Sequence, residues 1–146
     1  MSDSRAVSTT LGYVLTLAIA ALLVTGLITA GGNYVENERE QVIRDELTVI
    51  AQQLAADIER ADRLARAASG SSTTVALNQT FSDQVTGTTY RIDLDSSDET
   101  VVVESLDPSI AISVEVQTTT PLRDSTVDGG SVQVRLASGA LEVRNV

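Results

Sequence analysis

The sequence predicts an α+β protein: a long N-terminal helix, first transmembrane and then amphipathic, followed by a small antiparallel β-sheet or sandwich head. Three observations support this class. Residues 11–30 form an uncharged apolar run; apolar side chains then recur every three or four residues; and from Ser71 onward apolar and polar residues alternate. The chain of 146 residues is long enough for one membrane segment and one small domain.

The first element is the predicted transmembrane helix, over residues 6–32. From Ala6 to Val35 no side chain is charged, and residues 11–30 alone span about 30 Å as a helix. The run is longer than the 7–15 apolar residues typical of a cleaved secretory signal. A plain signal anchor, or a helix retained after cleavage in front of it, fits better. The flanking charges do not settle which side of the membrane the head occupies.

Small residues recur at intervals of four along this helix. They are Gly12, Thr16 and Ala20 and, separately, Gly26 and Ala30. This spacing lets helix backbones approach closely, although small residues are also simply frequent in membrane helices. The threonines at positions 16, 25 and 29 can return their hydroxyls to the preceding turn.

The second element is an amphipathic helical stem over residues 33–69. Its apolar side chains lie at helical spacing and comprise Ile43, Leu47, Ile50, Leu54, Ile58, Ala61 and either Leu64 or Ala65. The acids and arginines of the stem, Asp62 among them, are expected on a solvated opposite face. The apolar stripe drifts as a 3.6-residue repeat does, which favours a helix laid on a domain over a two-stranded coiled coil. Gly31 and Gly32 allow either a continuous helix or a hinge.

The third element is a β-rich head over residues 71–146. Six candidate strands run over residues 73–77, 88–94, 100–106, 110–117, 131–136 and 141–145. Turn residues separate them, for example Asp107-Pro108 and Asp128-Gly129-Gly130. Six short strands with no helix between them predict an antiparallel sheet or sandwich, whose modest core the apolar face of the stem is expected to complete.

Composition removes several classes of site. The chain has no Cys and no His, which excludes disulfides, thiolate metal sites and the commonest general base. It also has no Lys, so a Ser–Lys hydrolase is excluded, and we expect no enzyme, no cofactor and no metal site. The net charge of −10 argues against a nucleic-acid partner. An acidic surface without Lys resembles the proteins of extreme halophiles, although a GC-rich genome would also favour Arg over Lys.

Two local motifs have the composition of a modification or ion-binding site. Asn78-Gln79-Thr80 is an N-glycosylation acceptor pattern, expected in a loop. The acidic stretch 95–99 could hold a hard cation such as Ca²⁺, but a solvated turn is the simpler interpretation.

The N-terminus carries a family resemblance. Arg5-Ala6-Val7-Ser8 in front of an uninterrupted apolar helix resembles the leader of haloarchaeal type IV pilins. The resemblance implies that a prepilin peptidase cuts between Arg5 and Ala6, releasing residues 1–5 as a leader. Residues 8–15 are similar to a group of small haloarchaeal pilin-like proteins. Common haloarchaeal pilins carry Pro-Val where this chain has Thr9-Thr10, which favours a minor or accessory subunit.

The resemblance implies a single-pass protein of the cell membrane with an extracellular head. It also implies a homo- or hetero-oligomer with other pilin-like subunits, and a subunit available for a surface filament. One alternative is a permanently anchored surface module whose head binds a partner. Another is an enzyme, which would need two carboxylates converging in the head.

Overall fold

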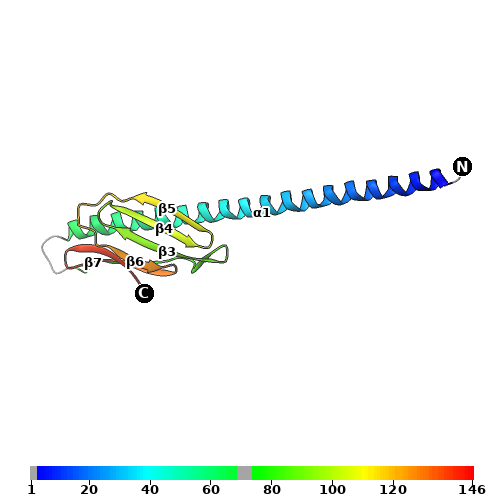
Figure 1. The fold of residues 1–146 in the computed structure, drawn as a ribbon. Helices are drawn as coiled ribbons and strands as arrows, with labels where there is room; N and C mark the ends of the chain where they lie inside the picture. The colour runs from blue at the N-terminus through cyan, green and yellow to red at the C-terminus, as the bar shows by residue number, and fades with distance from the viewer. Residues whose placement is uncertain (1–2, 69–73) are drawn as a thin grey trace. The chain divides into compact units, whose positions relative to one another are not determined.

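A computed structural model describes the backbone of residues 3–68 and 74–146, and the side chains of residues 10–68 and 74–146. The chain forms two compact units, Met1–Glu38 and Arg39–Val146. Helix α1 (Asp3–Ala67) contributes to both units, and all strands belong to the second (Figure 1). The strands are β1 (Ala76–Thr80), β2 (Gln84–Val85), β3 (Thr88–Asp95), β4 (Thr100–Leu106), β5 (Ser109–Glu115), β6 (Ser125–Asp128), β7 (Ser131–Ala137) and β8 (Ala140–Asn145). The predicted α+β class is confirmed.

Helix α1 stays helical through Gly31 and Gly32. Each glycine weakens a helix by up to about 1 kcal/mol relative to alanine. The backbone nevertheless keeps its helical conformation at both positions. The alternative of a break at the two glycines is therefore not what the structure adopts.

The strands of the second unit form two antiparallel sheets. In the first sheet, β2, β3, β4 and β5 are neighbours in that order. Strand β6 also pairs with β3, outside this order. In the second, the order is β1-β7-β8. The two sheets meet along β8. The Val143 N–H of β8 donates to Ser125 Oγ of β6 at 3.1 Å, and Leu122, which precedes β6, forms a parallel bridge with Leu141 of β8.

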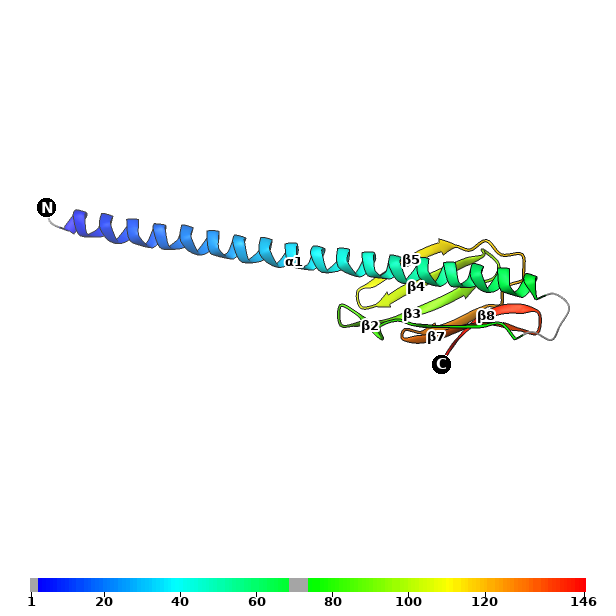
Figure 2. The same ribbon diagram turned by 180° about the vertical axis from the view of Figure 1, so that it is seen from behind.

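The core of the second unit lies between α1 and the two sheets (Figure 2). The predicted apolar stripe from Ile43 to Ala61 is buried in it, together with inward side chains such as Ile92, Val103 and Val134. At the end of the stripe, Ala65 packs against the core while Leu64 is 44% exposed. The prediction that the stem completes the core of the head is thus confirmed.

The predicted strands differ from the observed ones at several boundaries, and the strand predicted over 110–117 ends at Glu115. The first strand runs over Ala76–Thr80 rather than 73–77, because its pairing with β7 places Leu77 opposite Val134. Strands β2 and β6 were not predicted. Strand β2 has two residues and β6 has one buried residue, Val127, so neither contains a readable alternation.

Candidate functional site

The first candidate site is the uncharged part of helix α1 between Leu11 and Val35. Its large apolar side chains are each between 51% and 73% exposed. They are Leu11, Tyr13, Val14, Leu15, Leu17, Ile19, Leu22, Leu23, Val24, Leu27, Ile28, Tyr34 and Val35. Among the described residues, the helix Thr10–Ala67 is long and apolar enough to cross a membrane. Its most apolar stretch of 18 residues has a mean hydropathy of 2.3, and no residue of that stretch is buried.

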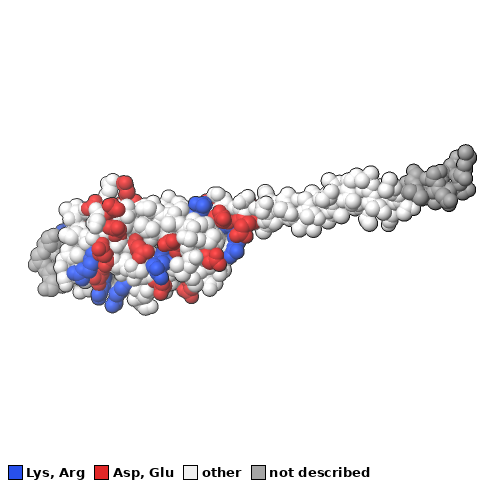
Figure 3. Space-filling view, in the orientation of Figure 1, with Lys and Arg blue, Asp and Glu red and all other residues white. Residues whose placement is uncertain are grey.

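Figure 3 shows this part of the helix without a charged side chain, whereas acids and arginines are spread over the visible face of the strand-bearing unit. A contiguous exposed apolar surface of this size is not stable in water and indicates contact with lipid or protein.

The three threonine hydroxyls of this segment are satisfied within the helix. Thr16 Oγ1 donates to the carbonyl of Gly12 at 2.9 Å. Thr25 Oγ1 donates to Ala21 O at 2.9 Å, and Thr29 Oγ1 donates to Thr25 O at 3.0 Å. The predicted return of all three hydroxyls to the preceding turn is confirmed. An unpaired hydroxyl would cost several kcal/mol in hydrocarbon, so these bonds make the segment compatible with a lipid environment.

The small residues predicted to pack helices lie on this exposed surface. A Cβ built on Gly12 or Gly26 would meet nothing within 4 Å. At 3.6 residues per turn, Gly12, Gly26 and Ala30 share one side of the helix, with Thr16 and Ala20 progressively further round. No contact within the described residues explains the glycines, and a role in helix packing stays a prediction.

The predicted cleavage position, between Arg5 and Ala6, lies on a helical stretch of backbone. The side chains of both residues are outside the described ones, as are Met1 and Ser2 altogether. Leader cleavage therefore stays a prediction.

The glycosylation pattern does not lie in a loop, contrary to expectation. Asn78 and Thr80 are exposed residues of β1, which is an edge strand of its sheet. Asn78 Oδ1 accepts a hydrogen bond from Gln133 Nε2 at 2.7 Å. The predicted strand ended at Leu77, which left Asn78 in the loop after it; the pairing of Ala76–Thr80 with β7 instead places Asn78 within β1.

The acidic turn after β3 uses its carboxylates internally. Asp95 Oδ1 accepts the N–H groups of Ser97 at 2.8 Å and Asp98 at 3.2 Å. Asp124 Oδ1 accepts from Ser96 N at 2.8 Å, and hydrogen bonds from the Ser96 side chain and backbone lower the pKa of Asp124. Over residues 10–68 and 74–146, no group of three or more metal-ligating side chains gathers. The turn is explained by its own hydrogen bonds.

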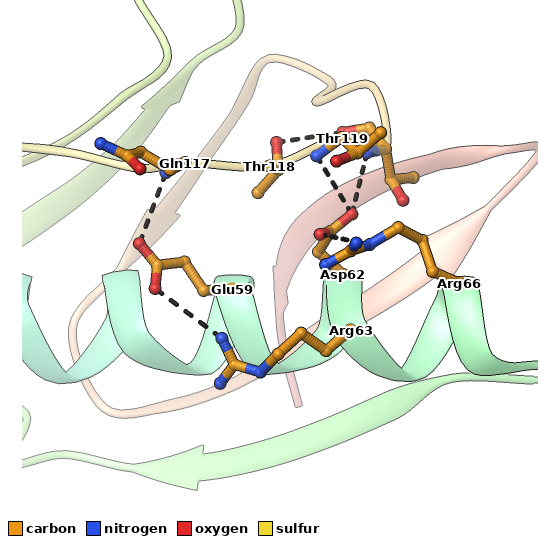
Figure 4. A network of polar contacts seen from close by, with 8 residues as sticks. Glu59, Asp62, Arg63, Arg66, Gln117, Thr118 and Thr119 are labelled. Atoms are coloured by element: carbon orange, nitrogen blue, oxygen red, sulfur yellow. Dashed lines mark hydrogen bonds and ion pairs between the residues drawn. The ribbon is translucent and has the colours of Figure 1, made fainter.

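Asp62 is a structural residue whose environment was predicted wrongly from the sequence. It was expected on the solvated face of the stem but is only 2% exposed. Its Oδ1 accepts the backbone N–H groups of Thr120 at 2.8 Å and Thr119 at 3.3 Å, and its Oδ2 pairs with Arg66 Nε at 3.0 Å (Figure 4). One turn earlier, Glu59 accepts from Gln117 N at 3.4 Å. These carboxylates hold the strand-free segment after β5 on the helix.

The charge state of Asp62 follows from these contacts. Burial alone raises the pKa of its carboxyl, but hydrogen bonds from Thr120 and Thr119 and the charge of Arg66 together outweigh burial, so the pKa lies below its usual value. The spacing of four residues to Arg66 could have indicated the ion pair, but not the contacts with Thr119 and Thr120.

A second carboxylate joins the strands on the outer side of the second sheet. Glu142 of β8 pairs with Arg135 of β7 and with Arg123, whose Nη1 lies 3.0 Å from Glu142 Oε2. Hydrogen bonding and charge from the two arginines lower the pKa of Glu142. The ion pair between Arg123 and Glu142 holds the segment before β6 against β8. The Glu142 carboxylate is occupied by the two arginines.

Comparison with known proteins places the chain by its sequence. No curated protein and no solved structure gives a match. A family described as a "Family of unknown function (DUF7266)" matches residues 2–145, nearly the whole chain. The chain therefore belongs to the DUF7266 family.

Proposed function

We propose that this protein is a pilin-like structural subunit of the cell surface, inserted in the membrane by the first part of helix α1. The strand-bearing unit is the extracellular head. A prepilin peptidase removes residues 1–5, after which the apolar helix is available for packing against other pilin-like subunits in a filament. The missing Pro-Val pair at Thr9-Thr10 favours a minor or accessory subunit.

The observation that carries the proposal is the exposed, charge-free surface between Leu11 and Ala30. Its length matches the hydrocarbon thickness of a bilayer, about 30 Å. Its threonine hydroxyls are already paired within the helix, so they need no hydrogen bond from water. The pilin-like sequence at Arg5-Ala6 then favours a helix that is kept after processing over a cleaved secretory signal.

Two further features support an extracellular head. Asn78 and Thr80 are exposed on an edge strand, where a glycosyltransferase could reach the Asn78 amide. The surface of the head is acidic, with no Lys, which suits a protein that faces concentrated salt.

Alkaline extraction and protease shaving of intact cells test the proposal. We expect the full-length protein to remain in the membrane pellet after carbonate washing, and its head to be degraded by protease added outside the cells. Release by carbonate would contradict membrane insertion. A head protected until the cells are lysed would contradict an extracellular location.

A further inference from the structure

The side of helix α1 that faces away from the sheets has no covering in the second unit. We define this outward face by eleven exposed residues: Val42, Asp45, Glu46, Val49, Gln52, Gln53, Ala56, Arg60, Arg63, Leu64 and Ala67. It lies opposite the buried stripe that begins at Ile43. Among the described residues no strand crosses it, as the view from behind shows (Figure 2). The fold of a single copy therefore leaves this face available.

Charge is sorted along the outward face. Its acids, Asp45 and Glu46, come first, and its arginines, Arg60 and Arg63, come last. Between these ends the chain has ten consecutive uncharged residues, 47–56, although the protein has 30 charged side chains, 20 acidic and 10 basic. The middle of the face also carries an apolar side chain, Val49, that is 51% exposed. A purely solvated helix face normally mixes charged residues throughout.

A hollow lies beside the acidic end of the outward face. It has a volume of about 450 Å³, and its lining includes Asp45, Glu46, Val49, Ile50, Phe81 and Val85. Apolar side chains and two carboxylates together suit an arginine, because its aliphatic stem packs on apolar surface while its guanidinium binds a carboxylate. The chain itself carries arginines on the same face, at the other end.

We propose that the outward face binds a second copy of this chain, in parallel and shifted along the helix by about 15 residues. Arg60 and Arg63 of one copy then lie against the acidic end of the next, and the uncharged middle provides close contact. A shift of 15 residues is about 22 Å along an α-helix. This inference rests on the proposed function, because helices anchored in one membrane with the same orientation can pair only in parallel.

The shift has a consequence for assembly. Each copy offers one acidic end and one arginine end, so the contact is head-to-tail and repeats without closing, as in a filament.

Thiol cross-linking tests the arrangement, because the chain has no cysteine of its own. Val49→Cys and Leu64→Cys place thiols on exposed positions 15 residues apart. In cells that display the full-length protein, a short bismaleimide should give a ladder of multimers with the double variant. It should give dimers when the two single variants are produced together, and no product from either single variant alone. Dimers from a single variant alone, or no product from any combination, would overturn the proposal.

Charge exchange tests the register. The pair Asp45→Arg with Glu46→Arg should lower the yield of cross-links about tenfold, because like charges then meet. Adding Arg60→Glu with Arg63→Glu should restore the yield. An unchanged yield in the first variant would overturn the pairing of the two ends. Failure of this interface is distinguishable from failure of the proposed function. Protein that stays in the membrane pellet and is shaved from outside, but never cross-links, would refute only this interface.

Discussion

The ring of Tyr90 lies directly against the backbone of Gly129. A Cβ built on Gly129 would be 2.6 Å from both Cε1 and Cζ of that ring. The Gly129 N–H donates to Tyr90 O at 3.0 Å, and the Tyr90 hydroxyl donates to Ser82 O at 2.7 Å. The tyrosine, only 1% exposed, thereby joins β3 to the turn between β6 and β7 and to the segment before β2.

Gly129→Ala should destabilise the head by about 1–3 kcal/mol, because the new methyl group overpacks the Tyr90 ring. The measurement is denaturant unfolding of the full-length protein in detergent, followed by far-ultraviolet circular dichroism. Gly31→Ala is the matched control, because a Cβ there meets nothing within 4 Å and alanine favours the helix. Equal unfolding midpoints for the Gly129→Ala variant and the parent protein would show that the contact is not tight in solution.

Asp62→Asn should destabilise the head by about 2 kcal/mol, because the amide loses the charge that holds the N–H groups of Thr119 and Thr120. Asp57→Asn serves as control on the same helix, since Asp57 makes no ion pair among the described residues. Amide hydrogen exchange should show faster exchange at positions 119 and 120 in the Asp62 variant alone. Unchanged protection at both positions would refute the role assigned to Asp62.

The same carboxylate predicts a pH dependence. The pKa of folded Asp62 lies below its usual value of 3.8, so the unfolded chain takes up a proton at higher pH than the folded one. Its contribution to stability is therefore complete well above pH 3.8 and is lost as the pH falls through the lowered pKa. The free-energy difference between the parent protein and Asp62→Asn should shrink on acidification below about pH 4. The pKa of Glu142 is also lowered, but this residue is present in both proteins, so its contribution cancels in the difference. A free-energy difference that does not vary with pH would contradict this linkage.

Leu22→Arg should reduce membrane insertion without altering the head. Leu22 is 73% exposed in the middle of the apolar segment, and an arginine there costs about 3 kcal/mol on insertion scales. The fraction of protein in carbonate-washed membranes measures the effect, with Leu22→Ala as control. Full retention of the arginine variant would mean that this segment does not occupy hydrocarbon.

Periodicity was enough to predict the main elements. The spacing of Ile43, Leu47 and Leu54 identified the buried side of the stem, and the alternation in residues 90–94 identified β3. These predictions succeed because each element buries only one side, so that apolar residues recur with the period of the helix or the strand.

The errors arose where tertiary contacts override local pattern. From the sequence alone Asp62 is expected on the surface, but the segment after β5 covers it in the structure. No local sequence signal places Thr119 beside that carboxylate. Similarly, the predicted first strand ended at Leu77, and only the pairing with β7 shows that Asn78 belongs to the strand.

The most direct test of the account is the mass of the mature N-terminus, measured by mass spectrometry on protein isolated from native membranes. We predict a chain that begins at Ala6, because cleavage between Arg5 and Ala6 removes the leader and keeps the apolar helix. A chain that retains Met1 or Ser2 would contradict the pilin-like account and leave a permanently anchored surface protein.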